Sequence, residues 1–471
     1  MSTVCAHLGH IYKKWVFILT EVLLFGCSER ELFSFRKVFC MVSARFSSAL
    51  KKLSKRVVER TLPNGLKVRF YPDATIPVFS YQTFFNVGSR NERPGITGIS
   101  HLFEHMMFNG SKKFGPGQFD KKLESQGGHS NAYTSFDMTV YYDNAASEAL
   151  ETVIELESDR MHSLQITSKT LETERQVVLE ERRMRVDNDI MGMMDEELSS
   201  LVWKAHPYRW PIIGYAGDIA AISKEDCLEF FRTYYAPNNA TLFVVGDIDV
   251  EVTFRLLKKY YGKIPSGPPI PPVVDAEPPQ KGERRAEIHF PAQTPYVMVA
   301  WRGPQASHED SLVLDVLQFI LGMGHSSRLV RSLVFEKEAA VSVSVNWAWR
   351  IHSGSFVIAM ELRPGISPKE AEHMLYEEVD LVLKNGIEKK ELEKAVNNLS
   401  MQILESFSTY QGCAQLLGCY EMFWGTWREG MGLLSRYAKI DEAAVQACAQ
   451  RYLKAELRNV VSLLPTEQGK I

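Results

Sequence analysis

Residues 95–108 carry the run Gly95-Ile-Thr-Gly-Ile-Ser-His-Leu-Phe-Glu-His-Met-Met-Phe108. Its second half contains neither Gly nor Pro, which predicts a helix. At 3.6 residues per turn, His101, Glu104 and His105 share one face of this helix, and apolar side chains cover most of the rest. Two imidazoles and a carboxylate in a buried helix need partners, and a metal ion would satisfy them. The alternative is a pair of core histidines bonded to carbonyl groups or water.

A third metal ligand is expected in the acidic stretch Leu171-Glu-Thr-Glu-Arg-Gln-Val-Val-Leu-Glu-Glu-Arg-Arg-Met184. On a helical wheel this stretch has one apolar face, which we predict to be buried and which comprises Leu171, Val177, Val178 and Met184. Glu174 and Glu181 fall near the middle of that face, an unusual place for carboxylates. We therefore predict Glu181 as the third ligand and Glu174 as a supporting carboxylate. Glu180, which falls to one side, is the competing assignment.

The H-x-x-E-H motif followed by Glu181 resembles the pitrilysin/insulinase family of zinc peptidases, the inverzincins. That family includes the mitochondrial processing peptidases and many bacterial envelope peptidases. Flanking stretches agree with the resemblance, which covers roughly residues 56–465; they are Asn86–Glu92, Gly127–Ser135, His206–Pro211 and Tyr234–Ala240.

The resemblance implies an α+β fold with two similar lobes, each a mainly antiparallel sheet covered by helices, together forming half of a peptidase clamshell. It also implies one Zn²⁺ per chain, with Glu104 as the general base that takes a proton from the attacking water. A peptide substrate would add to an exposed strand edge. The resemblance places that edge at Asn131 and Ala132, although an ordinary internal strand there is the alternative.

The pattern along the chain agrees with an α+β fold of two lobes. Residues 1–55 suggest a leader, 56–264 a metal-binding N-terminal lobe, 265–284 a proline-rich linker and 285–471 a C-terminal lobe. In the N-terminal lobe we expect a hairpin around residues 63–65, a strand at 78–87 and a single strand at 131–142.

The order of predicted elements repeats after the linker. A strand at 296–301 echoes the strand at 78–87, and a last strand at 459–464 echoes the one at 241–248. The helix at 391–407 corresponds to the acidic helix and places Gln402 at the position of Glu181. An amide is a poor zinc ligand, so we expect one catalytic metal per chain.

The first 55 residues suggest targeting. Two lysines precede a twelve-residue apolar run from Trp15 to Gly26, which resembles a secretory signal, and Cys27 stands where a lipid anchor would be attached. These features favour the cell envelope or periplasm. The basic, serine-containing stretch that follows would also suit a mitochondrial presequence and the matrix, especially with a start at Met41. A third possibility is an over-extended start with no targeting role.

Composition excludes some classes of function. The net charge of −3 gives no reason to expect nucleic acid as a partner. Seven cysteines without C-x-x-C spacing make a disulfide scaffold unlikely.

One departure from the family concerns the C-terminal lobe. Active members carry an Arg and a Tyr there that contact the substrate and the reaction's oxyanion, but this chain has Val334 and Val341 at those positions. Arg331 lies nearby without matching the spacing. We therefore expect a related subunit, or a second copy of this chain, to complete the site.

These features predict a zinc-dependent endopeptidase that hydrolyses unfolded or small polypeptides. The alternative is a non-catalytic peptide-binding or assembly subunit of the same fold, although such subunits typically have a degraded metal motif.

Overall fold

The computed structural model describes residues 50, 52–273 and 277–466. Most of the predicted leader, including Cys27 and Met41, lies outside the described residues. Leu50 and Leu53 are nevertheless buried, so the end of the segment that we assigned to the leader packs against the folded core. No helix in the described part of the chain is long and apolar enough to cross a membrane.

The N-terminal half builds a six-stranded sheet with the strand order β1-β2-β6-β3-β5-β4. Its strands are β1 (Val58–Thr61), β2 (Lys67–Pro72), β3 (Val78–Phe85), β4 (His129–Thr134), β5 (Thr139–Ala146) and β6 (Ala240–Gly246). Neighbours are antiparallel except β2 and β6, which are parallel. The strand β6 is buried along its whole length, whereas β4 forms a free edge of the sheet.

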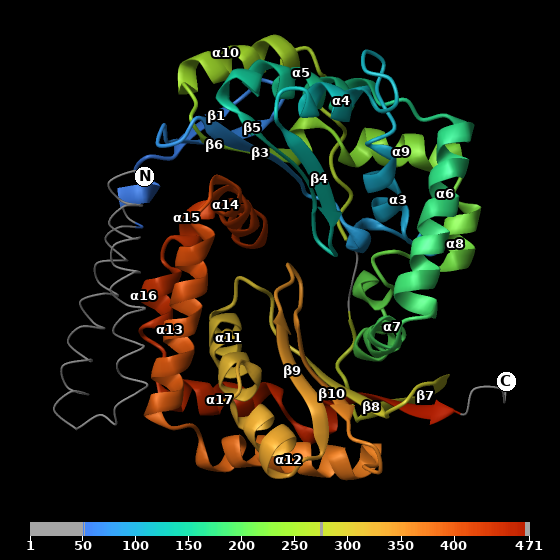
Figure 1. Ribbon diagram of the computed structural model, residues 1–471, viewed down its shortest axis with the longest axis vertical. Coiled ribbons are helices and arrows are strands. Elements are labelled where there is room, and N and C mark those ends of the chain that lie inside the picture. Colours follow the sequence, from blue (N-terminus) through green and yellow to red (C-terminus); the bar gives the residue numbers. More distant parts are fainter. Residues whose placement is uncertain (1–49, 51, 274–276, 467–471) are drawn as a thin grey trace.

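The helices of this half cover the sheet and continue beyond its β4 edge (Figure 1). They are α3 (Ile99–Met106), α4 (Gln118–Glu124), α5 (Leu150–Ser163), α6 (Ser168–Arg182), α7 (Ile190–Val202), α8 (Ala216–Ala221), α9 (Lys224–Tyr234) and α10 (Val250–Tyr261). A short π-helical turn, η3 (Arg183–Asp187), extends α6. The helix α3 lies between β4 and α6 and packs against both, which brings the two predicted metal-binding segments together.

The C-terminal half builds a five-stranded sheet with the order β7-β11-β8-β10-β9. Its strands are β7 (Arg284–Pro291), β8 (Tyr296–Arg302), β9 (Ala340–Ala348), β10 (Ser355–Leu362) and β11 (Asn459–Thr466). Its helices are α11 (Glu309–Gly322), α12 (Pro368–Asn385), α13 (Lys389–Ser406), α14 (Tyr410–Trp424), α15 (Trp427–Gly430), α16 (Leu433–Tyr437) and α17 (Glu442–Tyr452), with a short helix η6 (Val330–Glu336).

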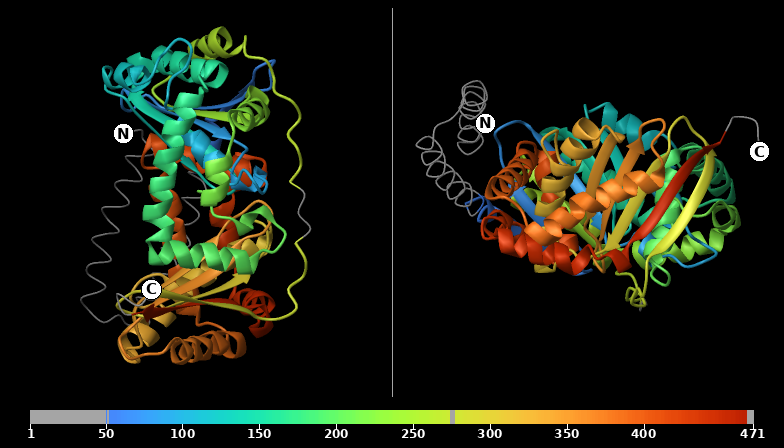
Figure 2. Two further views of the ribbon diagram at one scale, coloured as in Figure 1. Left: turned by 90° about the vertical axis from the view of Figure 1, so that its right-hand side faces the viewer. Right: turned by 90° about the horizontal axis from the view of Figure 1, so that it is seen from below.

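The two sheets share one topology, which confirms the predicted α+β fold with two similar lobes. The order β7-β11-β8-β10-β9 matches β2-β6-β3-β5-β4 strand for strand. The pairs β2–β6 and β7–β11 are parallel, and the other matching pairs are antiparallel in both sheets. Between α10 and β7, the described parts of the proline-rich segment run along the outside of the molecule from one sheet to the other (Figure 2).

The halves exchange one helix each. The helix α7 of the N-terminal half packs on β7, β8 and β11 of the second sheet, where Met194 and Leu198 join its apolar core. The helix α14 of the C-terminal half packs on β3 and β6 of the first sheet, where Leu417 lies in the same core as Phe84. The two sheets are therefore tied together by packing as well as by the connecting segment.

The prediction of a single strand over Asn131–Tyr142 is wrong. The stretch forms β4, a tight turn and β5. The Ser135 N–H donates to the Met138 carbonyl at 2.8 Å, and Ser135 Oγ accepts from the N–H groups of Asp137 and Met138. The alternation of side chains continues through the hairpin with Thr134 opposite Thr139, so the pattern alone did not reveal the turn.

Candidate metal centre and cleft

The helix α3 is held at its N-terminus by a buried carboxylate. Glu92 accepts hydrogen bonds from the backbone N–H groups of Gly98 (2.8 Å) and Ser100 (2.9 Å). Such a carboxylate supplies partners for the free N–H groups of a first helical turn. Burial raises the pKa of Glu92 to about 8, although both hydrogen bonds favour the charged form. The opposite side of α3 is fixed by Leu102 and Phe103, which are fully buried.

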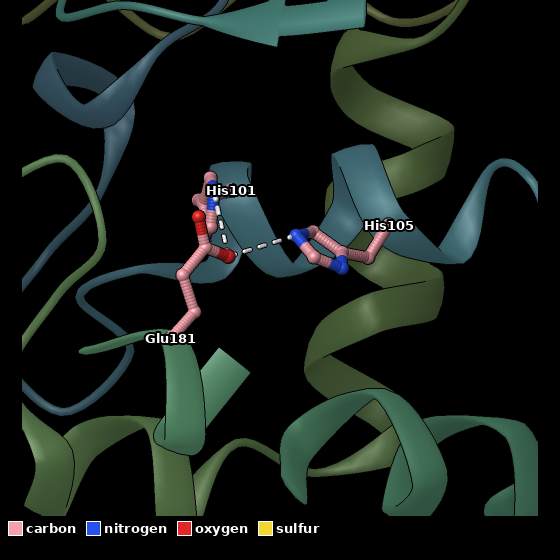
Figure 3. Close-up of side chains that lie close together, drawn as sticks. All are labelled: His101, His105 and Glu181. Atoms are coloured by element: carbon pink, nitrogen blue, oxygen red, sulfur yellow. Dashed lines mark ion pairs between the residues drawn. The ribbon is translucent and has the colours of Figure 1, made fainter. Parts of the chain in front are cut away.

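The structure brings His101, His105 and Glu181 together (Figure 3). Nε2 of His101 lies 3.7 Å from Oε2 of Glu181, and Nε2 of His105 lies 3.3 Å from the same oxygen. One ligand atom from each of the three residues lies within 4.8 Å of the others. No other group of three or more His, Cys, Asp or Glu side chains is as close within residues 50, 52–273 and 277–466.

Glu174 contacts the second nitrogen of His105. Its Oε2 lies 3.4 Å from His105 Nδ1, which leaves Nε2 directed at Glu181. A carboxylate on the distal ring nitrogen is the usual support of a metal-binding histidine. Hydrogen bonds to Glu174 and Glu181 raise the pKa of His105 to about 9, whereas burial lowers the pKa of His101 to about 4. Nδ1 of His101 is buried without a hydrogen-bond partner among the described residues.

Glu104 lies one turn after His101, next to this group. Its Oε2 accepts a hydrogen bond of 2.5 Å from the Thr134 hydroxyl at the end of β4. Burial raises the pKa of Glu104. The Glu104 carboxyl group therefore lies between α3, which carries both histidines, and the free edge strand β4. Its orientation depends on the contact with β4.

Glu180, the competing assignment, is not part of this group. Its side chain is 63% exposed and pairs with Arg183 at 2.8 Å, whereas that of Glu181 is 18% exposed. Our prediction that the whole apolar face of this helix is buried is wrong for two residues. Val177 is 45% and Met184 is 71% exposed, because this part of the face lines an open cleft.

The cleft has a volume of about 1190 Å³ and lies between α3, α6, α7 and β4. Asn131 and Ala132, the predicted substrate-binding residues, line it together with His101, Glu104, His105 and Glu181. The Ala132 N–H donates to Asn131 Oδ1 at 2.8 Å and not to β5, so it points away from the sheet. The structure thus places a backbone donor on the free edge of β4, beside the candidate metal ligands.

Two residues that line the cleft, Thr134 and Arg185, were not predicted from the sequence. Thr134 belongs to the stretch that we misread as one strand, so its contact with Glu104 could not be foreseen. Arg185, whose guanidinium lies 2.9 Å from Glu181 Oε1, follows that glutamate by one helical turn. The i, i+4 spacing was visible in the sequence and could have identified it.

The C-terminal half contributes no residue to the lining of this cleft among the described residues. Val334 is half-buried in η6, and Val341 is 49% exposed at the start of β9. Arg331 pairs with Glu336 at 3.2 Å and is 65% exposed. None of the three therefore takes the place of the family's Arg and Tyr at this site.

The residues present fit a zinc ion. Two imidazole nitrogens and one carboxylate are a donor set that zinc uses in catalytic sites. Both imidazoles direct Nε2 to the same carboxylate oxygen, and Glu174 supports one of them from behind. The buried, unpartnered Nδ1 of His101 is consistent with a ring whose position is set by what Nε2 binds.

Comparison with protein families matches both halves of the chain. Residues 73–215 match the model of the insulinase family, peptidase family M16, and residues 221–399 match the model described as the peptidase M16 inactive domain. The zinc protease PqqE of Helicobacter pylori is 32% identical over 364 residues, which cover 76% of this chain and 82% of that protein.

Two solved structures show the same arrangement. A protease from Helicobacter pylori superposes with a TM-score of 0.84 at 30% identity, covering 87% of this chain and 99% of that one. The periplasmic protease PqqL from Escherichia coli superposes with a TM-score of 0.73 at 20% identity. There 87% of this chain corresponds to only 48% of the PqqL chain, so the PqqL chain is about twice the size of the matching unit.

Proposed function

The chain belongs to the insulinase family of peptidases, M16, and on that premise we propose that it is a zinc-dependent endopeptidase acting on unfolded or small polypeptides. The observation that carries this proposal is the meeting of His101, His105 and Glu181 with Glu104 at the free edge of β4. A site that only bound peptides would not need a carboxylate beside three metal-ligand side chains. The zinc proteases among its relatives support the same activity.

We assign the metal to Nε2 of His101, Nε2 of His105 and the carboxylate of Glu181. Zinc held there would supply Lewis acidity, which activates water and polarises the carbonyl of the bond to be cleaved. Glu174 keeps Nδ1 of His105 occupied and so leaves Nε2 available. The guanidinium of Arg185 pairs with Oε1 of Glu181, the oxygen that does not face the histidines, and so compensates part of the carboxylate's charge.

Glu104 is the general base in this proposal. It takes the proton of the attacking water at one carboxylate oxygen and later gives it to the nitrogen of the leaving amine. Thr134 holds Oε2, so Oε1 is the oxygen that we assign to proton transfer. Burial, which raises the pKa of Glu104, brings it closer to the pH at which a group can both accept and donate a proton.

The substrate backbone binds as an additional strand along β4. The Ala132 N–H, which Asn131 Oδ1 occupies in the structure, becomes available when the asparagine side chain turns away. Pairing of this kind depends on the backbone and accepts extended peptides of many sequences. A folded protein offers few such segments, so we expect unfolded or short polypeptides as substrates.

A second polypeptide completes the site in this proposal. Among the residues that the structure describes, none from the C-terminal half lines the cleft, and the side chains of Val334 and Val341 offer no hydrogen-bond donor for an oxyanion. The PqqL chain is about twice as long as the part that matches this chain, so it has room for a second body beside the matching one. We therefore expect a related subunit with Arg and Tyr, or a second copy of this chain, to face the cleft.

Metal removal tests the proposed function. A quenched fluorescent peptide should be cleaved by the zinc-loaded protein, should become inert after treatment with a chelator, and should be cleaved again after addition of one equivalent of zinc. Cleavage that survives complete removal of the metal would contradict the proposal. Tight peptide binding with no cleavage by the zinc-loaded protein, alone or with its partner, would favour a non-catalytic subunit instead.

A further inference from the structure

Arg350 is a buried arginine that passes from the C-terminal half into the N-terminal half. It lies in the connection between β9 and β10 and is 8% exposed. Its guanidinium lies 3.9 Å from the ring centre of Phe136, 4.4 Å from that of Trp203 and 4.8 Å from that of Tyr208. All three rings belong to the N-terminal half, so a cation of one half occupies an aromatic cage of the other.

The cage leaves the charge of Arg350 without an ion pair at contact distance among the described residues. Nη1 has no hydrogen-bond partner there, and burial lowers the pKa of the guanidinium. The carboxylates of Asp137 and Asp195 act on it electrostatically without an ion pair at contact distance. Burying a cation is costly, and contact with three aromatic rings offsets part of that cost. The guanidinium therefore links the C-terminal half specifically to these three rings.

The same connection also binds the turn between β4 and β5. The Ile351 N–H donates to Asp137 Oδ2 at 3.1 Å, and Tyr208 donates its hydroxyl proton to Asp137 Oδ1 at 2.6 Å. The His352 N–H in turn donates to the Tyr208 hydroxyl at 3.3 Å. Asp137 is only 2% exposed, so the turn is closed by groups from both halves. In Figure 1 the β9–β10 hairpin points toward the end of β4.

This turn leads directly to the candidate base. Phe136, which stacks on Arg350, lines the cleft, and Thr134, two residues earlier, holds Glu104 Oε2. A shift of the turn would therefore move the last residues of the substrate-binding strand. It would also change the orientation of the Glu104 carboxylate. The contacts form one short route from Arg350 through Phe136 and Asp137 to Thr134 and Glu104.

We propose that Arg350 is a positioning residue, through which the C-terminal half sets the β4–β5 turn and with it the peptide-binding edge and Glu104. The catalytic part of this inference rests on the proposed peptidase function, whereas the ordering of the turn does not. The half of the chain without a metal motif thereby contributes to the reaction without touching substrate or metal.

Hydrogen exchange tests the ordering of the turn independently of activity. In Arg350→Met, which keeps an unbranched apolar stem and removes the guanidinium with its charge, amides of residues 130–139 should exchange at least about tenfold faster than in the wild type. Arg350→Lys, which keeps the charge but not the planar group, should lie between the two. Unchanged exchange in these amides in a folded Arg350→Met protein would overturn the proposal. If Arg350→Met does not fold, Arg350→Lys decides by the same comparison.

A matched control is available at the other end of the sheet. Arg69 on β2 is also 8% exposed and pairs with the buried Glu421 of the C-terminal half at 2.9 Å. Because β6, β3 and β5 separate β2 from β4, Arg69→Met combined with Glu421→Gln should weaken the contact between the halves and leave exchange in residues 130–139 unchanged. Equally fast exchange of residues 130–139 in this double variant would overturn the specific role of Arg350, because any weakening of the contact between the halves would then loosen the turn.

Kinetics then test the link to catalysis. Zinc content should stay the same in Arg350→Met, kcat should fall at least about tenfold and KM should rise, because misplaced catalytic groups are costly. Arg350→Lys should recover part of kcat. Faster exchange with unchanged kcat and KM would overturn the catalytic part alone. If the wild-type protein itself cleaves no peptide, the proposed function fails, while the exchange experiment still decides whether Arg350 orders the turn.

Discussion

Glu180 and Glu181 are neighbours with the same functional group, yet their surroundings are opposite. Glu181 faces two histidines, whereas Glu180 faces solvent and Arg183. The helical wheel distinguished the two from the sequence because Glu181 lies on the side of Leu171 and Val178, which are buried. The wheel could not show that Val177 and Met184, on the same side, are exposed at a cleft, since the cleft depends on segments distant in the sequence.

The two neighbours provide a paired test of the metal ligands. Glu181→Gln should lower zinc affinity by more than about 100-fold, since it replaces a charged ligand with a neutral amide, and Glu180→Gln should change it by less than about twofold. Competition with a fluorescent zinc chelator measures both. A large loss in Glu180→Gln with none in Glu181→Gln would reverse the assignment.

Contacts between segments far apart in the chain were beyond the sequence. Thr134 and Arg350 each matter only through a partner more than 25 positions away in the chain. Local spacing therefore identified the candidate ligands and the candidate base, whereas the residues that contact or position this candidate base could be found only from the fold.

At the scale of single elements, the start of α3 decides where the candidate ligands lie. Gly98 has φ +87 at the N-terminus of α3, and a Cβ there would lie 2.3 Å from the backbone oxygen of Ile213. Gly117 starts α4 with a similar φ of +71, but a Cβ there would meet nothing within 4 Å. Only glycine adopts this conformation without strain.

The two glycines make a matched pair for a stability measurement. Gly98→Ala should lower the free energy of unfolding by about 2–4 kcal/mol, because backbone strain adds to a clash with fixed backbone atoms. Gly117→Ala should cost only about 1 kcal/mol, from strain alone. Urea denaturation measures both, and zinc content should fall only in Gly98→Ala. Equal losses would show that the contact of α3 with Ile213 is unimportant.

The elements that the sequence did reveal have strong local patterns. The hairpin around residues 63–65, the strand β3 and the helix α6 follow from turn residues and periodicity. The β4–β5 turn did not, because Ser135 closes it without Gly or Pro. The helices α7 and α14 were not predicted, and their packing on the opposite sheet could not follow from local pattern.

At the scale of the whole molecule, the chain forms two copies of one sheet topology, of which one carries the candidate metal site. The repeat was visible as a repeated order of elements, because strand order follows the chain in the same way in both halves. The exchange of α7 and α14 ties the two halves together, and the proposed role of Arg350 links the second half to the same site. The described residues of the second half nevertheless contribute nothing to the lining of the cleft.

Mixing experiments test whether a second body is needed. A related chain that carries the family's Arg and Tyr but no zinc motif should raise kcat/KM for a quenched peptide by at least about 100-fold, the cost of a missing oxyanion donor. If a second copy of this chain serves instead, the rate per chain should rise with concentration as dimers form. A rate that changes neither with the added related chain nor with protein concentration would show that the single chain is self-sufficient.

The central claim is that Glu104 performs proton transfer beside one zinc held by His101, His105 and Glu181. The most direct test is cleavage of a quenched peptide by the wild type and by Glu104→Gln, each with zinc content measured in the same preparation and in the presence of any partner. The predicted result is one zinc in both proteins and a loss of kcat by about 100-fold or more in Glu104→Gln. Comparable cleavage by Glu104→Gln with zinc bound would contradict the account.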